Sequence, residues 1–229
     1  MSVTRDGAWL HFDLGAPLRA LSWSLTKPGF VTTEAMVWRE VKNRDLTPDL
    51  DVHAWYEAEL SAKGWGGAVA FLTSRDIGTW VEATASVEGV RAHAVATVGL
   101  SNGERVGSRV DYSGRDWNGK WGTINVGLRL SEGLTEAALI EAMAIAVQAR
   151  TAAVMDAGVL LPTGRATGTG TDCVGVAAPL GDNPYAGLHT AVGEAAGRAV
   201  YDAVLKGAKE WRQTYPKAPG VPMEDLGWT

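Results

Sequence analysis

The segment around residue 170 holds the side chains best suited to chemistry. It reads Ala166-Thr167-Gly168-Thr169-Gly170-Thr171-Asp172-Cys173, so hydroxyls and one carboxylate stand among glycines. Backbone N–H groups in such a loop can point toward an anion or a carbonyl oxygen. No Gly-Lys-Ser/Thr follows, and the glycine spacing does not fit a dinucleotide fingerprint. The segment predicts a binding loop with Asp172 as a catalytic carboxylate. The structural alternative is a glycine turn between a buried helix and a strand.

A histidine and a glutamate near the start of the last predicted helix are the second candidates. His189 is expected in the first turn of this helix, where it could act as a general acid or base because histidine titrates near neutrality. Glu194 follows five residues later, roughly 140° around the helix, so the two do not share a face for one metal ion. The alternative for His189 is a capping or partly buried structural role.

Polar residues near two strand ends form the third group. Ser101 and Asn102 follow an apolar stretch, and binding residues often lie where a strand ends. Ser101 is not in a Gly-x-Ser-x-Gly elbow, so the motif does not imply a nucleophile. Asn125 stands inside an apolar strand and must find hydrogen-bond partners if it points inward. Asn125 could hold an amide oxygen or tie backbone together, and Ser101-Asn102 could be an ordinary turn.

Composition limits the class of protein. The chain has 229 residues, of which 46% are hydrophobic and 21% charged, as in ordinary globular domains. The net charge of -5 is not the basic footprint of a nucleic-acid-binding protein. One cysteine excludes an intrachain disulfide and a cysteine-based zinc cage, and no metal site is predicted. A signal peptide and an uninterrupted apolar span are not recognised, which favours a cytoplasmic protein that does not enter the membrane. A homo-oligomer is left open.

Strand signals dominate the first 130 residues and helix signals dominate the rest. Residues 81–87 and 90–96 alternate around Glu88-Gly89, which predicts a hairpin with Thr84 opposite His93. A helix is expected to start near residues 47–51 and end at Gly64, and a buried helix to start at 131–135 and reach Met155. Further strands are expected at 9–12, 18–21, 31–41, 68–72, 121–130 and 174–178, loops at 101–120 and 159–172, and a last helix over 188–203.

This order of elements predicts an α+β fold in a single domain, with a mostly antiparallel sheet covered by long C-terminal helices. We expect one catalytic domain over residues 1–212. Residues 213–229 carry three prolines, which predicts an extended tail.

Six stretches in this order resemble the adenosylcobinamide amidohydrolase family, over roughly residues 5–206, and their joint order is what makes the resemblance specific. They are Arg19-Ala20-Leu21-Ser22, Phe71-Leu72-Thr73-Ser74-Arg75-Asp76, Ala96-Thr97-Val98-Gly99-Leu100-Ser101-Asn102, Gly122-Thr123-Ile124-Asn125, Thr167-Gly168-Thr169-Gly170-Thr171-Asp172, and Ala186-Gly187-Leu188-His189-Thr190 running on into Gly193-Glu194 and Gly197-Arg198-Ala199-Val200. Residues 23–30 depart from the family, which tends to have a glycine-rich turn of small residues there.

The resemblance implies an enzyme of corrinoid salvage. Water would cleave the amide between the ring propionate and the aminopropanol arm of adenosylcobinamide, giving adenosylcobyric acid for cobalamin assembly. The corrinoid is the substrate, and no cofactor is implied. Trp23, Trp65, Trp117 and Trp121 are candidates for an apolar wall against the corrin ring.

For that reaction, His189 is our candidate for the acid that protonates the departing amine, and Asp172 or Glu194 for the base that activates water. Asn102, Asn125 and the N–H groups of residues 168–170 are candidates for binding the oxyanion. Ser101, Thr167, Gly168, Thr169, Gly170 and Thr171 complete the predicted substrate-binding set. A covalent route through Ser101, Thr171 or Cys173 stays open.

This assignment requires the 170 segment and His189 to close around one cleft. Two other functions are open from the sequence. The first is a non-catalytic corrinoid-binding protein on the same scaffold. The second is an enzyme that holds phosphate in the Thr-Gly-Thr-Gly loop.

Overall fold

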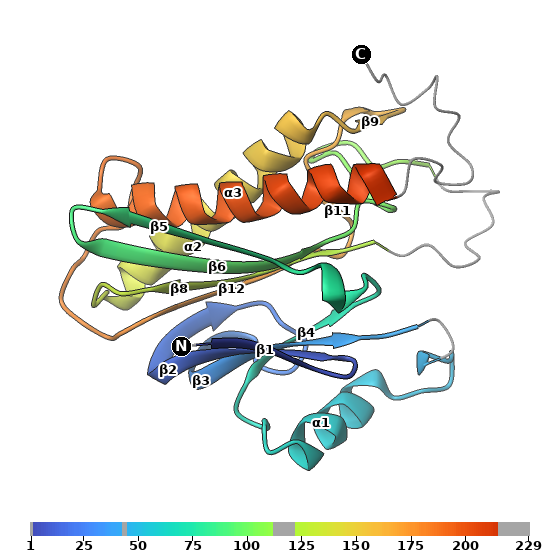
Figure 1. Cartoon of the computed structure of the whole chain (residues 1–229), viewed down its shortest axis with the longest axis horizontal. Helices are drawn as coiled ribbons and strands as arrows, with labels where there is room; N and C mark the ends of the chain where they lie inside the picture. Colours follow the sequence, from blue (N-terminus) through green and yellow to red (C-terminus); the bar gives the residue numbers. More distant parts are fainter. Residues whose placement is uncertain (1, 43–44, 112–121, 215–229) are drawn as a thin grey trace.

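The computed structural model describes residues 2–42, 45–111 and 122–214, and it has the predicted α+β architecture (Figure 1). The elements are β1 (Ser2–Asp6), β2 (Trp9–Ser22), β3 (Gly29–Glu40), α1 (Val52–Ala62), β4 (Val69–Thr73), a 3-10 turn (Ile77–Thr79), β5 (Val81–Val87), β6 (Val90–Val98), β7 (Gly103–Glu104), β8 (Ile124–Leu130), α2 (Glu136–Ala157), β9 (Leu160–Leu161), β10 (Gly164–Arg165), β11 (Gly168–Thr169), β12 (Cys173–Ala178) and α3 (Ala191–Thr214).

Eight strands form one mixed sheet, in the order β4-β3-β2-β12-β8-β6-β5, with β1 paired to β2. The pairs β3/β4 and β12/β8 are parallel and the other pairs of this sheet are antiparallel, so the prediction of a mostly antiparallel sheet is confirmed. The predicted hairpin has the expected register, with Thr84 opposite His93 and Val87 opposite Val90.

The sheet folds back so that its two halves face each other. The two short strands expected at 9–12 and 18–21 are one long strand, because β2 passes through a register shift between Asp13 and Leu18 instead of a loop. A Cβ on Gly127 of β8 would lie 2.8 Å from the side chains of Met36 and Trp38 on β3, which shows how closely the halves approach. The inner core between them contains Phe12, Trp38 and Phe71.

Helices cover both outer surfaces. In Figure 1, α2 and α3 lie above the half made of β5, β6, β8 and β12, and α1 lies below the half made of β1 to β4. Thr135 caps the start of α2, and Gly158 ends it with a left-handed conformation, as the sequence predicts. Among the described helices, α2 is the one long and apolar enough to cross a membrane, but half of that stretch is buried in the fold, as in a core helix.

Two boundaries differ from the prediction. Helix α3 begins at Ala191, so His189 lies in the turn before the helix and not in its first turn. The same helix continues to Thr214, beyond its expected end at 203, and residues 215–229 of the predicted tail lie outside the described residues. The predicted loop over 159–172 contains the short strands β9, β10 and β11, and β11 pairs with β7 from the predicted loop over 101–120.

Candidate functional site

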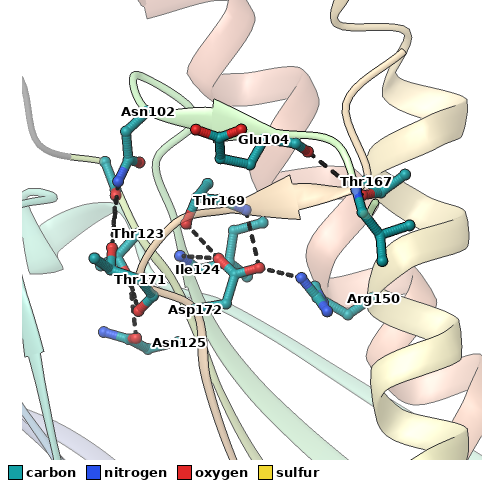
Figure 2. Close-up of polar contacts among 12 residues, drawn as sticks. Asn102, Glu104, Thr123, Ile124, Asn125, Arg150, Thr167, Thr169, Thr171 and Asp172 are labelled. Atoms are coloured by element: carbon teal, nitrogen blue, oxygen red, sulfur yellow. Dashed lines mark hydrogen bonds and ion pairs between the residues drawn. The ribbon is translucent and has the colours of Figure 1, made fainter. Parts of the chain in front are cut away.

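Asp172 is the centre of a polar cluster that joins three parts of the chain (Figure 2). Its Oδ1 accepts hydrogen bonds from the Thr169 hydroxyl at 2.5 Å and the Ile124 N–H at 3.1 Å. Its Oδ2 accepts from the Thr169 N–H at 3.0 Å and forms an ion pair with Arg150 of α2. A carboxylate offers about four lone-pair positions, and all four are occupied here. The geometry therefore supports a positioning role for Asp172 rather than that of a free base.

The ion pair is buried. The side chains of Asp172 and Arg150 are only 7% and 12% exposed. Burial raises the pKa of Asp172, while the Arg150 guanidinium and the hydrogen bonds from Thr169 and Ile124 act in the opposite direction. A Cβ at Gly168 would collide with Arg150 and lie 2.5 Å from Asp172 Oδ2, so any larger residue there would displace this ion pair. Arg150 was not among the predicted site residues, since its sequence position marks only a cation inside an apolar helix.

Three N–H groups of the glycine–threonine loop are already used within the protein. Thr169 N donates to Asp172 and Gly170 N donates to the Asn102 carbonyl at 3.3 Å. Thr167 N donates to the Glu104 carbonyl, and the Thr167 hydroxyl accepts from Val106 N at 2.8 Å. The expectation that N–H groups of residues 168–170 bind an oxyanion is therefore wrong for Thr169 and Gly170. The loop is closed onto residues 102–106, which leaves these three N–H groups unavailable to a phosphate.

Three of the predicted segments converge beside this cluster. The Asn102 amide lies 3.4 Å from the Thr171 hydroxyl, which lies 3.2 Å from the Gly122 carbonyl. The Thr123 hydroxyl donates to the Thr171 carbonyl at 2.8 Å and lies 3.2 Å from Asn125 Oδ1. Ser101 lies against Gly122, where a Cβ would be 2.5 Å from Ser101 N. Segments far apart in sequence thus form one polar surface.

Asn125 links the two halves of the sheet. It is buried, and its amide donates to the Leu72 carbonyl of β4 at 2.7 Å. The interpretation that it ties backbone together is therefore supported. The same side chain also lines a cavity, so a second contact to a ligand is compatible with its position.

A cavity of 680 Å³ opens beside this polar surface. Its polar side is formed by Ser74, Thr123, Asn125, Thr171 and Asp172. Its apolar side includes Trp23, Leu25, Val41 and Leu46, and Lys42 is the one cation among the described residues that line it. The volume and the mixed lining are those of a small-molecule site.

Trp23 was an expected wall residue and lies here, whereas Trp65 packs on Trp9 and His11 and lies outside the lining. Trp117 and Trp121 lie outside the described residues.

Cys173 also lines this cavity. Burial raises the pKa of its thiol to about 12, so the thiolate that a covalent mechanism needs is scarce near neutral pH. This environment disfavours Cys173 as the nucleophile.

His189 and Glu194 lie elsewhere. The turn before α3 contacts the first half of α2, where Ala186 N donates to Glu141 at 2.7 Å. Asp172 instead contacts Arg150, which is about 13 Å further along the same helix. Figure 1 shows the start of α3 and β11 toward opposite ends of the helical layer. His189 is exposed, and Glu194 pairs with Arg198 at 2.6 Å. The expectation that one cleft holds both Asp172 and His189 is therefore wrong.

No group of three or more His, Cys, Asp or Glu side chains that could hold a metal ion occurs in residues 2–42, 45–111 and 122–214.

The fold defines a small α+β protein with a cavity whose size suits a small molecule, and sequence comparison gives its family. The model of the adenosylcobinamide amidohydrolase family (CbiZ) matches residues 1–216, so the chain belongs to this family. No curated protein matches it significantly. A similar solved structure is the PH0078 protein from Pyrococcus horikoshii OT3, with 11% identity over 87% of this chain and 76% of that one, and a TM-score of 0.44.

Proposed function

We propose that this protein hydrolyses the amide that joins the aminopropanol arm of adenosylcobinamide to the corrin ring. The observation that carries the proposal is the convergence of the family's segments at the polar side of one cavity. The arm enters the 680 Å³ cavity with its amide toward Thr123, Asn125 and Thr171. The ring, which is too wide to be enclosed, stays at the apolar rim.

In this proposal water attacks the amide carbon directly. A carbon–oxygen bond forms, the carbon–nitrogen bond breaks, and the proton that the attacking water gives up passes to the departing amine. The Thr171 hydroxyl and the Asn125 amide orient the substrate amide. The Lys42 ammonium, held near the rim by its ion pair with Glu40, stabilises the developing oxyanion. His189 and Glu194 stay a prediction from the sequence, without a contact to the cavity that supports them.

The direct test is to incubate the purified protein with adenosylcobinamide and to follow adenosylcobyric acid by mass spectrometry. Product formation without added metal or cofactor is the expected result. Binding without product would favour a non-catalytic corrinoid-binding protein instead. The phosphate-ligand alternative is disfavoured, since the N–H groups of Thr167, Thr169 and Gly170 in the loop donate within the protein.

Variants then test the site. Thr171→Val removes the hydroxyl at an exposed position and should lower kcat/KM by about ten- to a thousandfold, as for a lost donor at a reacting carbonyl, while Thr171→Ser should retain most activity. Lys42→Met should lower kcat by a similar factor. His189→Ala should remain active, because its side chain lies outside the cavity. Full activity in Thr171→Val and Lys42→Met, with loss in His189→Ala, would move the site to the start of α3.

We also propose a cytoplasmic location and no cofactor requirement. Activity that survives dialysis against a strong chelator would support the second statement.

A further inference from the structure

The segment after β2 has an inverted pattern of burial. Ser22 and Ser24 are 3% and 2% exposed, whereas Trp23 and Leu25 between and after them are 46% and 38% exposed. Thr26 is buried as well, and its hydroxyl has no partner among the described residues. In most folded proteins serine and threonine are exposed and tryptophan and leucine are buried, because polar groups are costly to remove from water and apolar side chains gain from burial.

The buried serines hold this segment in one conformation. The Ser22 hydroxyl donates to the Lys27 carbonyl at 2.8 Å, accepts from Ser24 N at 3.3 Å and lies 3.0 Å from the Ser24 hydroxyl. The segment is therefore a closed turn with polar groups inside. The turn presents Trp23 and Leu25 outward.

Trp23 is fixed in turn to the polar cluster. Its indole N–H donates to the Asp172 carbonyl at 2.9 Å, which holds the ring beside the cavity mouth. Trp23 and Leu25 both line the cavity, so this apolar surface is continuous with the polar side that contains Thr171.

We propose that Trp23 and Leu25 form a platform that binds the corrin ring and selects complete corrinoids over small amides. This inference rests on the proposed function, because the ring it holds belongs to the proposed substrate. A corrin has a broad, conjugated and largely apolar face with polar amide arms at its edge. The platform takes the face while the cavity takes one arm. Stacking on tryptophan then places the amide at Thr171.

The platform can be tested by binding alone, with adenosylcobyric acid as the probe. This ligand keeps the ring and lacks the amide that would be cut. Equilibrium dialysis should give a Kd for Trp23→Ala about ten- to a hundredfold higher than for the wild type, as expected from the loss of about 100 Å² of apolar contact. Leu25→Ser should weaken binding by a smaller factor. Trp23→Phe should recover most of the affinity because it keeps an aromatic face, although it loses the hydrogen bond to Asp172.

Tyr185→Ala is the matched control, since this aromatic residue is also exposed but lies outside the cavity lining. It should bind like the wild type, and the melting temperatures of all variants should confirm that they fold. Unchanged affinity in folded Trp23→Ala would overturn the platform. Failure of the proposed function would give a different result. Ring binding would still depend on Trp23, but adenosylcobinamide would not be hydrolysed.

Discussion

At the scale of single residues, the site is organised by the buried Asp172 carboxylate, whose two oxygens both accept hydrogen bonds from within the protein. Asp172 holds the loop at residues 169–172 to β8 through Ile124 and to α2 through Arg150. Such a carboxylate is costly to bury unless all its partners are present. Asp172 therefore fixes the position of Thr171, and through its own carbonyl it fixes Trp23.

Replacing the Arg150 cation should show how much this buried ion pair contributes to the stability of the fold. Arg150→Gln leaves the Asp172 carboxylate buried without its counter-charge and should lower the free energy of unfolding by about 3–5 kcal/mol at neutral pH. The Arg150 charge lowers the pKa of Asp172, so the variant raises it further. When the folded pKa of a carboxyl lies above its unfolded pKa, the protein loses stability as pH rises from the unfolded value through the folded one. The stability deficit of the variant relative to the wild type should therefore grow from about pH 4 to pH 7.

Urea denaturation at several pH values measures this deficit. Arg198→Gln, which breaks the exposed pair with Glu194, is the control and should change stability by less than about 1 kcal/mol. A deficit for Arg150→Gln that shrinks with rising pH would contradict the role given to this pair.

The single cysteine allows a second test at this scale. With a pKa of about 12, the folded Cys173 thiol should be ionised to only on the order of one part in ten thousand near pH 8, against roughly a quarter when unfolded. Its reaction with a thiol reagent should be at least about a hundredfold slower in the folded protein than in urea, and should still accelerate above pH 10. Cys173→Ser should remain an active hydrolase, since the mechanism does not use the thiolate. A fast thiol at neutral pH would restore the covalent route.

At the scale of elements, the site depends on close approach between backbone segments. Gly122 precedes β8 and lies against Gly99 and Ser101, where an added Cβ would be 2.5 Å from Ser101 N and 2.7 Å from the Gly99 carbonyl oxygen. These neighbours are backbone atoms and cannot rotate away. The approach brings the end of β6 to the start of β8, beside Thr123 and Thr171.

Gly122→Ala should therefore destabilise the fold by about 1–3 kcal/mol through overpacking. Gly66→Ala is the matched control, because a Cβ at Gly66 meets nothing within 4 Å, and it should be neutral or stabilising by up to about 1 kcal/mol. Differential scanning calorimetry of the two variants provides the comparison. Equal melting temperatures would show that the backbone segments can separate without cost.

At the scale of the whole molecule, local patterns predicted the elements and the mostly antiparallel sheet covered by helices, but they did not predict that the sheet folds onto itself. The hairpin at Glu88-Gly89 and the capped helix α2 follow from alternation and capping, which are local properties. The folding of the sheet onto itself is set by β2 and by glycines such as Gly127, whose neighbours on β3 are distant in sequence.

The site shows the same division. The segments at residues 101–102, 122–125 and 167–172 were recognisable from their polar residues and glycines, and the structure brings them together. Arg150 was not found, because a cation in an apolar helix has no local signal for its partner. His189 was chosen for its chemistry, although its distance from Asp172 depends on how α3 lies across the sheet.

In the proposed function the cavity receives the aminopropanol arm of the corrinoid, and Cys173 reports on this directly because it lines that cavity. The measurement is the rate of Cys173 alkylation by iodoacetamide at about pH 9, with increasing adenosylcobinamide, read by intact mass. If the arm occupies the cavity, protection should saturate in the folded protein, and the corrinoid should have no effect on the urea-unfolded chain. An alkylation rate that stays constant while the corrinoid is bound would contradict it.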